Sequence, residues 1–329
     1  MAVFTRLEHD VLTRWIGRYP IGGLLHFEGI RSGIENSNYF VTTTRGRFVL
    51  TLFERLTHAQ LPFHLDLMRH LAARGIPCPD PVANLDGAVL ATLAGKPAAL
   101  CTWLDGGAVD TPAAHHCAQL GETIARMHLA AADFPGQAPN PRGLDWQLSV
   151  APDLLTRLEP EPARLLADEL QQQRAFAASA CALPASAVHA DLFRDNVFFA
   201  GQAPEPPLCG VIDFWFAGVD HWLFDLAVAA NDWCLSPTDR PRADHCDHVD
   251  GFDAGRLDAL MAAYRRVRPL DDAECAAWPM MLRAAALRFW ISRLFDRYFP
   301  RPAEIVAPKD PAHFEHLLRR HRAVAAALR

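Results

Sequence analysis

The sequence predicts an α+β fold of two lobes: a small N-terminal lobe with an antiparallel sheet and one helix, and a larger, mostly helical C-terminal lobe. Strand-like segments fill the first hundred residues, whereas helical periodicity dominates the rest of the chain. Between the two patterns, residues 104–107 (Leu-Asp-Gly-Gly) have the composition of a hinge. We therefore expect lobes of residues 1–104 and 105–329.

The N-terminal lobe is expected to hold five strands and one helix. Short apolar runs bounded by turn residues predict the strands. A capping-box pattern at Thr57 and Gln60 precedes apolar residues at helical spacing, and Gly75 and Pro77 supply the stop. The predicted strands cover residues 24–28, 38–43, 47–53, 88–93 and 98–103.

The C-terminal lobe is expected to be helical apart from one short β region at residues 188–213. Thr111 followed by Pro112 is a favourable N-cap and first-turn pair. Apolar periodicity predicts the other helices. The predicted helices cover residues 111–132, 154–181, 223–234, 254–267, 272–297 and 311–328.

The composition narrows the range of functions. With 329 residues, half of them hydrophobic, the chain can bury a large core, and its net charge of −6 argues against a nucleic-acid partner. The eight cysteines include no CxxC pair, which predicts a reduced, cytoplasmic protein. No signal peptide or run of about 18 apolar residues is apparent, so we expect no membrane partner.

The strongest chemical signal is an HxDx₄N pattern at Asp191 and Asn196, followed by an apolar strand that ends in Asp213. Residues 197–200 and 208–212 are predicted to be short strands joined by a proline-rich turn. If they pair as a hairpin, the start of the first strand lies beside the end of the second. Asn196 and Asp213 then come together, with Asp191 a few residues upstream.

These residue types match the needs of phosphoryl transfer. One carboxylate orients the attacking hydroxyl, while an amide oxygen and a second carboxylate hold Mg²⁺ on the nucleotide phosphates. Hard oxygen ligands favour Mg²⁺ over Zn²⁺. The alternative is a polar turn before an ordinary buried hairpin, since Asp and Asn are common turn residues. The complete pattern favours kinase chemistry. His189 either orients the loop or is a buried histidine with satisfied hydrogen bonds.

Residues 188–199 (VHADLFRDNVFF) resemble the catalytic segment of the aminoglycoside/choline phosphotransferase superfamily, small-molecule relatives of the protein kinases. Across nearly the whole chain, the sequence is similar to the bacterial type II homoserine kinases of that superfamily. Four further segments carry the likeness: 33–40 (GIENSNYF), 48–54 (FVLTLFE), 73–77 (ARGIP) and 286–294 (ALRFWISRL).

The resemblance implies a protein-kinase-like fold. Residues 1–104 would form a nucleotide-binding lobe, and residues 105–329 a catalytic and substrate-binding lobe. By the same resemblance, Asp191 is the catalytic base, Asn196 and Asp213 are the metal ligands, and ATP and Mg²⁺ are the cofactors.

The loop between the first two predicted strands is the expected phosphate-covering loop. Gly33 permits close backbone approach, and Asn36, Ser37 and Asn38 can donate hydrogen bonds to phosphate oxygens. Such a polar loop is by itself usually a hairpin turn. Its position ahead of the strand at 47–53 favours the functional interpretation.

The last strand before the hinge is expected to cover adenine, with backbone groups near Thr102 and Leu104 available to it. A protein kinase carries a lysine in its third strand, paired with a helix glutamate. Here Thr51 occupies that position, and Asp66 is the corresponding helix acid. The phosphate clamp is therefore unassigned, with loop amides, Mg²⁺, Arg47 or another arginine as candidates.

Four arginines recur along the predicted helix at 272–297. They are explained either by snorkelling from a partly buried helix or by recognition of a substrate carboxylate. Arg288 is the best carboxylate ligand, because it lies within a Phe-Trp run. Asp195 or Asp220 is expected to meet a substrate ammonium, and Asp225 to brace the catalytic loop.

The leading functional hypothesis, which follows from the resemblance, is phosphorylation of L-homoserine by ATP to O-phospho-L-homoserine, a step in threonine biosynthesis. A second hypothesis is a kinase of the same fold acting on choline, an aminoglycoside or methylthioribose. A third is a catalytically inactive nucleotide-binding module, suggested by Thr51. The presence of Asp191, Asn196 and Asp213 argues against the third.

Overall fold

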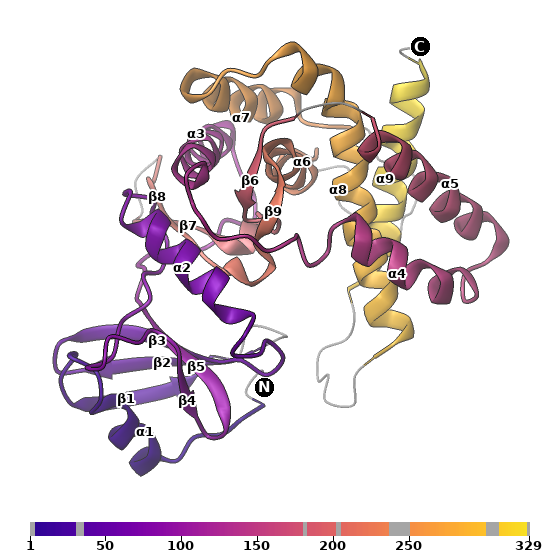
Figure 1. Ribbon diagram of the computed structural model, residues 1–329. Coiled ribbons are helices and arrows are strands. Elements are labelled where there is room, and N and C mark those ends of the chain that lie inside the picture. The colour runs from indigo at the N-terminus through magenta and orange to yellow at the C-terminus, as the bar shows by residue number, and fades with distance from the viewer. Residues whose placement is uncertain are drawn as a thin grey trace. The chain divides into compact units, whose positions relative to one another are not determined.

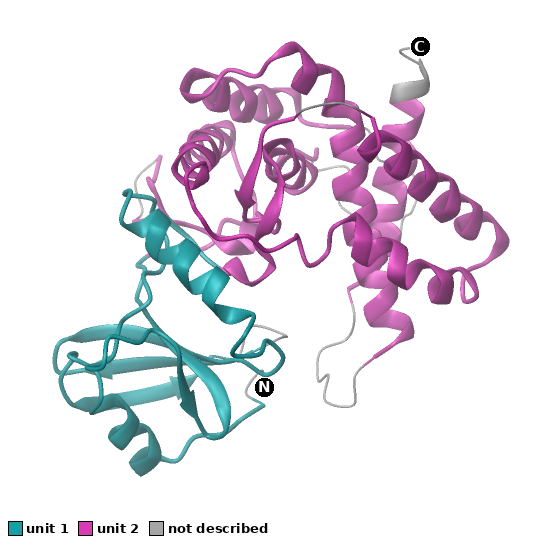
Figure 2. Cartoon of the chain, in the orientation of Figure 1, with its two compact units in different colours: residues 1–105, 210–212, 302–307 teal, residues 106–209, 213–301, 308–329 magenta. Residues whose placement is uncertain are grey.

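The computed structural model describes residues 4–30, 36–179, 183–201, 205–236, 251–300 and 309–327. These residues separate into two compact units (Figure 2). The sheet unit holds the described residues up to Asp105, together with Gly210–Ile212. The helical unit holds the described residues of 106–209 and those from Asp213 onward.

The sheet unit is built on five antiparallel strands in the order β1-β2-β3-β5-β4 (Figure 1). Its register sets Thr51 between Asn38 and Ala99 of the neighbouring strands. The predicted strands are present, although β4 is shorter than expected. Their bounds are β1 (Leu24–Gly29), β2 (Ser37–Thr43), β3 (Gly46–Leu52), β4 (Ala91–Leu93) and β5 (Lys96–Thr102).

Two helices, α1 (His9–Ile16) and α2 (Leu61–Ala72), accompany this sheet. The sequence analysis did not anticipate α1. Leu12, Trp15 and Ile16 share one helix face and are buried in a single cluster with apolar side chains of the sheet. Because α1 has only two turns, its stability comes from this packing rather than from helix propensity.

Among the described residues, the helical unit combines seven helices with two small strand pairs, except that Gly210 and Val211 of the second pair belong to the sheet unit. Strand β6 pairs with β9, and β7 pairs with β8. The strands are β6 (Ala185–Val188), β7 (Val197–Phe199), β8 (Leu208–Val211) and β9 (Gly218–His221). The helices are α3 (Ala114–Ala131), α4 (Leu144–Leu155), α5 (Pro160–Ala177), α6 (Trp222–Trp233), α7 (Ala254–Val267), α8 (Asp272–Tyr298) and α9 (Ala312–Ala327).

Helix α6 is the most enclosed part of this unit. Ten of its twelve residues are buried, and α8 packs against it. A helix that is apolar and buried on all sides belongs at the centre of a core. Helices α3 and α7 lie especially close, because a Cβ added to Gly121 would come within 2.1 Å of the Leu260 carbonyl oxygen.

The single long helix expected at residues 154–181 is wrong. The structure has two helices there, since α4 ends at Leu155 and α5 begins at Pro160. Proline is favourable in the first turn of a helix, where its missing N–H needs no partner. Pro160 therefore marks the start of a new helix in the sequence itself.

A buried ion pair joins α5 to α8. The Arg283 guanidinium donates from Nε to both carboxylate oxygens of Glu169, at 3.0 and 3.2 Å, and Glu169 is fully buried.

Among the helices that the structure describes, none is long and apolar enough to cross a membrane.

Candidate active site

The catalytic segment predicted from sequence, residues 189–196, is a loop of the helical unit between β6 and β7. A carboxylate on α6 holds its backbone. Asp225, fully buried, accepts hydrogen bonds from the backbone N–H groups of His189 (2.8 Å) and Ala190 (2.6 Å). The prediction that Asp225 braces this loop is confirmed.

These bonds hold a strained backbone. Ala190 has a left-handed conformation, with φ of 64°. A residue with a Cβ pays roughly 1–2 kcal/mol in that region. A hydrogen bond to a charged group contributes about 1.5–3 kcal/mol, so the bond to Asp225 is strong enough to offset the strain.

Asp225 keeps its charge inside the core. Burial raises its pKa, but the hydrogen bond and charge of His128, together with His189, outweigh burial and hold the pKa below its ordinary value of 3.8. His128 Nε2 lies 3.3 Å from the carboxylate, and its Nδ1 lies 3.0 Å from the Tyr264 hydroxyl. Asp225 is therefore an anion at neutral pH.

The loop presents Asp191 with different partners on its two oxygens. The Asn196 amide donates from Nδ2 to the Asp191 backbone oxygen (2.8 Å) and to Oδ2 (3.1 Å). Arg288 Nη2 lies 3.4 Å from Oδ1. Burial raises the pKa of Asp191, while Arg288 and His189 act against that rise. The Asn196 amide nitrogen is thus committed to Asp191, and its oxygen is the atom left to serve as an acceptor.

Asp213 follows the strand β8, as predicted. The Ala200 N–H donates to the Pro207 carbonyl (2.9 Å) at the turn that joins β7 to β8, so the predicted hairpin is confirmed. Asn196 and Asp213 therefore lie at the same end of the hairpin. Asp213 also has a left-handed backbone, with φ of 66°. Such strain in a non-glycine residue is typical of functional positions.

His189 combines the two roles considered for it. It is buried, with its ring 4.6 Å from that of Phe214. Its Nδ1 accepts a hydrogen bond from the Asp191 N–H (3.2 Å). His189 is thus a buried histidine that also fixes the backbone at Asp191.

Arg288 lies on α8 and is only 3% exposed. Its guanidinium lies over the ring of Phe289, 3.8 Å from the centroid, and 5.0 Å from the ring centroid of Phe216. Snorkelling does not describe this residue, because its charged group is in the interior beside Asp191. α8 therefore supplies a buried cation beside Asp191.

The two acids considered for a substrate ammonium differ in environment. The Asp195 side chain is 69% exposed, with Lys309 Nζ 3.9 Å away. Asp220, on β9, accepts hydrogen bonds from the Asn140 amide (2.8 Å) and the His221 N–H (2.7 Å). Of the two, Asp195 lies in the catalytic loop and faces solvent, whereas Asp220 is already engaged in the β9 structure.

The phosphate-loop candidates belong to the sheet unit. Gly33 lies outside the described residues. The Ser37 hydroxyl accepts from the N–H groups of Phe4 (2.8 Å) and Thr5 (2.9 Å) and donates to Glu54 (2.7 Å). Its one proton is therefore committed, so Ser37 anchors the exit of the loop rather than offering a hydroxyl proton to phosphate.

The two asparagines, Asn36 just before β2 and Asn38 within it, are held through their side-chain oxygens. Asn36 Oδ1 accepts from the Glu54 N–H (3.4 Å), and Asn38 Oδ1 accepts from the Thr51 hydroxyl (2.8 Å). A neutral pair thus occupies the position of the kinase lysine. Lys96 pairs with Glu54 at 2.8 Å. The expected helix acid, Asp66, is exposed on α2.

The adenine-side candidates lie at the end of β5. The Thr102 N–H donates a hydrogen bond to the Asp80 carbonyl (3.0 Å), and the Thr102 hydroxyl accepts one from the Asp80 N–H (2.9 Å). Leu104 follows and is partly buried. Between them, Trp103 stacks under the Arg47 guanidinium, 4.4 Å from the ring centroid. Arg47, a candidate phosphate clamp, is thus already engaged beside the hinge segment.

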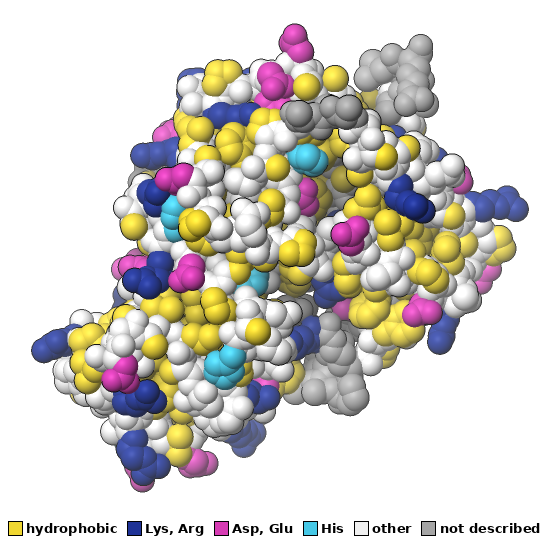
Figure 3. All heavy atoms as spheres, in the orientation of Figure 1, with side chains coloured by type: hydrophobic (Ala, Val, Ile, Leu, Met, Phe, Trp, Pro, Cys, Tyr) yellow, Lys and Arg dark blue, Asp and Glu magenta, His cyan; other side chains and the backbone are white. Residues whose placement is uncertain are grey.

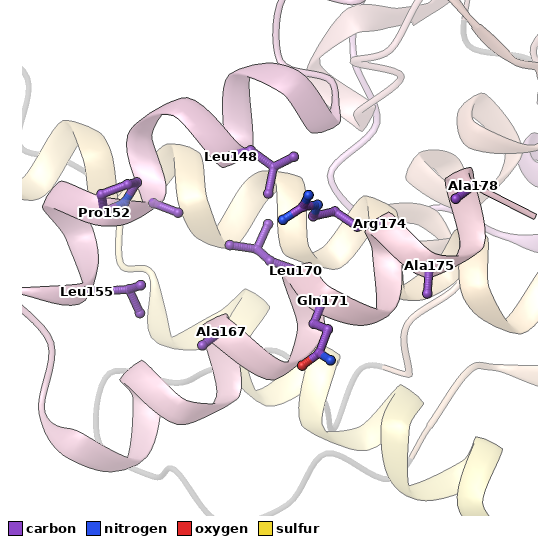
Figure 4. Close-up of a pocket in the computed structure, with 10 residues that line it drawn as sticks. Leu148, Pro152, Leu155, Ala167, Leu170, Gln171, Arg174, Ala175 and Ala178 are labelled. Carbon is purple, nitrogen blue, oxygen red and sulfur yellow. The ribbon is translucent and has the colours of Figure 1, made fainter.

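A groove of about 590 Å³ lies between α4 and α5, where hydrophobic atoms gather in the space-filling view (Figure 3). Leu148, Pro152 and Leu170 from the two helices face it, with Arg174 beside them (Figure 4). None of its lining residues is a predicted site residue. The groove is therefore separate from the catalytic loop.

The chain matches a known enzyme family. The model of the phosphotransferase enzyme family matches residues 26–270, so the chain belongs to that family. Solved structures of similar fold include an amicoumacin kinase in complex with AMP-PNP and Ca²⁺ (TM-score 0.67, 18% identity, 96% of this chain and 92% of that chain). Another is a choline kinase from Cryptosporidium parvum (TM-score 0.66, 13% identity, 97% of each chain). The predicted fold class is confirmed.

Closer relatives cover the whole chain. A homoserine kinase of Paraburkholderia phytofirmans is 50% identical over 97% of this chain and 95% of the relative. A homoserine kinase of Burkholderia cenocepacia is 50% identical over 100% of this chain and 98% of the relative. The resemblance to homoserine kinases inferred from the sequence is confirmed.

Replacement of the buried anion should destabilise the helical unit. Asp225→Asn leaves one acceptor for the two loop N–H groups, so we expect a loss of about 3 kcal/mol in the free energy of unfolding by urea at neutral pH. A carboxylate whose pKa is lower in the folded than in the unfolded state stabilises the fold at pH values above its unfolded-state pKa. This stabilisation is lost as the pH falls through its folded-state pKa. The difference between wild type and variant should therefore shrink below pH 3.8.

Asp220→Asn is the matched control. Burial raises the pKa of Asp220, so its charge does not stabilise the fold in the way that the charge of Asp225 does. We expect a smaller loss for this variant. Equal stability of wild type and Asp225→Asn at neutral pH would contradict the bracing role.

Proposed function

We propose that this protein is a homoserine kinase, which transfers the γ-phosphate of ATP to the hydroxyl of L-homoserine to give O-phospho-L-homoserine in threonine biosynthesis. The observation that carries the proposal is the 50% identity to homoserine kinases over essentially the whole chain. The neighbours of known structure are under 20% identical and support the fold alone.

Asp191 is proposed as the catalytic base. Its Oδ2 receives the Asn196 amide and its Oδ1 faces Arg288, so the carboxylate is held in a defined orientation. It would accept the proton of the acceptor hydroxyl and orient the oxygen for in-line attack on the γ-phosphate. Positioning of this kind supplies most of the catalysis in phosphoryl transfer, because the protein forms no bond itself.

Asn196 and Asp213 are the proposed ligands of Mg²⁺. An amide oxygen and a carboxylate at one end of the β7–β8 hairpin are the hard donors that this ion prefers. Among the residues that the structure describes, no three His, Cys, Asp or Glu side chains form a metal site by themselves. The remaining ligands would therefore be phosphate oxygens and water. Bound Mg²⁺ neutralises charge on the nucleotide phosphates.

The acceptor is proposed to lie between Arg288 and Asp195. In homoserine, three carbon atoms separate the hydroxyl oxygen from the carboxylate group. A cation next to the base suits such a short molecule, because Arg288 could take the carboxylate while Asp191 takes the hydroxyl. Asp195 is exposed in the same loop and is proposed to meet the ammonium group.

Residues 1–104 are proposed to bind the nucleotide. Gly33 and the amide groups of Asn36 and Asn38 would contact phosphate, and Ser37 would anchor the loop from behind. Backbone groups near Thr102 and Leu104 would contact adenine. We also propose that the protein is soluble and located in the cytoplasm.

The acceptor is tested by a coupled ADP-release assay. A site that pairs both charges of homoserine should reject analogues that lack one of them, so we expect kcat/KM for L-homoserine to exceed that for choline, an aminoglycoside or methylthioribose by at least ~100-fold. Asp191→Ala should lower turnover by about 10²–10⁴-fold with L-homoserine. Turnover of choline and none of homoserine would refute the proposed substrate. Nucleotide binding with no turnover of any acceptor would favour the inactive module.

The metal ligands are tested by Mg²⁺ titration of turnover. Asp213→Asn removes an anionic ligand, so we expect a large rise in the half-saturating Mg²⁺ concentration and a severe loss of kcat. Asn196→Ala removes a neutral ligand and should have the smaller effect. Asp153→Asn, at an exposed carboxylate on α4, is the control. Titration curves of both site variants that overlay the wild type would place the metal elsewhere.

A further inference from the structure

A second carboxylate of α6 contacts the catalytic loop at the turn that carries Asn196. Asp232 accepts hydrogen bonds from Arg194, with Oδ2 2.9 Å from Nε and Oδ1 2.9 Å from Nη2. The same Oδ2 accepts the backbone N–H of Arg194 at 2.9 Å. One carboxylate therefore holds both the side chain and the main chain of a single loop residue.

The geometry of this pair is restrictive. Two parallel N–H···O bonds between a guanidinium and a carboxylate fix the relative orientation of both planes. The side chains are mostly buried, 24% exposed for Arg194 and 11% for Asp232. Arg194 also donates from Nη1 to the Asp110 carbonyl (2.7 Å), in the segment before α3. We call this group of three residues the loop clamp.

The clamp acts on a short 3₁₀ turn, Arg194–Asn196. Such a turn has few hydrogen bonds of its own. Within it, the Asn196 N–H donates to the Phe193 carbonyl (3.0 Å). Because Arg194 begins the turn, fixing its backbone N–H fixes where the turn starts and hence where Asn196 points.

Asn196 in turn restrains the position of Asp191, the proposed base. Its amide donates to both the backbone and the carboxylate of Asp191. A shift of the turn would move the proposed metal ligand and the proposed base together. Displacement of a reacting group by about 1 Å can cost 10²-fold in rate.

We propose that Arg194 and Asp232 are positioning residues for phosphoryl transfer, because their ion pair sets the orientation of the Asn196 amide and, through it, of Asp191. The inference rests on the proposed function only in that the loop is catalytic. It does not depend on which alcohol is the acceptor. Asp232 binds no reacting atom and acts through the turn.

The matched control is another bidentate arginine–carboxylate pair of the same unit, the buried pair of Arg283 with Glu169. It joins α5 to α8 and contacts no residue of the catalytic loop. Both pairs are mostly buried, so removal of either carboxylate should lower the melting temperature. Only removal of Asp232 should alter the catalytic turn.

The test compares Asp232→Asn, Asp232→Ala, Arg194→Lys and the control Glu169→Gln in the full chain. For the three clamp variants we expect kcat to fall about 10²-fold, with KM for ATP within about twofold of wild type. The half-saturating Mg²⁺ concentration should rise several-fold. Glu169→Gln should lower the melting temperature while leaving kcat and the Mg²⁺ requirement unchanged. The double variant Arg194→Lys/Asp232→Ala should lose no more kcat than either of its single variants, since either change opens the clamp.

A readout independent of turnover is the affinity for AMP-PNP, measured by calorimetry with and without Mg²⁺. The clamp variants should bind more weakly only when Mg²⁺ is present. Folded clamp variants with wild-type kcat and Mg²⁺ dependence would overturn the proposal. A rise in acceptor KM at unchanged kcat would also overturn it, because Asp232 would then be an acceptor ligand.

Failure of the proposed function is a separate result. If the wild type uses another alcohol, the variants are compared with that alcohol. If the wild type turns over no acceptor, the Mg²⁺-dependent AMP-PNP affinity still decides whether the clamp orients Asn196.

Discussion

The catalytic loop depends on one buried charge. Asp225 is ionised within a helix that is almost wholly buried, and its two oxygens accept the N–H groups of His189 and Ala190. Isolated, such an anion would be costly in the core. His128 and the loop supply the compensating hydrogen bonds. The loop is therefore held to the core, because its backbone N–H groups donate hydrogen bonds to the buried carboxylate of Asp225.

A later residue of the loop is also hydrogen-bonded to α6. About two turns beyond Asp225, Trp233 donates from its indole N–H to the Leu192 carbonyl (3.0 Å). The loop is thus hydrogen-bonded to α6 at both Asp225 and Trp233. These bonds stabilise the strained backbone conformation of Ala190. Asp191 and Asn196 gain fixed positions without belonging to an α-helix or a strand. Rigid support of this kind is what a reaction governed by positioning requires.

Local chemistry explains how much was predictable. The HxDx₄N pattern, the strand before Asp213 and the hairpin that joins them are short-range features, so the sequence alone predicted the loop and the hairpin that carry the candidate residues. Contacts between distant segments were not visible, such as Arg288 beside Asp191. The same holds for Ser37, whose hydroxyl is bound by residues more than thirty positions earlier. Periodicity shows which face is buried, but it does not show which polar group lies opposite.

Amide hydrogen exchange of the native protein, read residue by residue by NMR, tests the bracing of the loop by α6 most directly. If Asp225 holds the loop as a part of the core, the amides of His189 and Ala190 exchange as slowly as those in the middle of α6, since all open together. Exchange of these two amides at the rate of exposed loop residues, with α6 fully protected, would contradict the account.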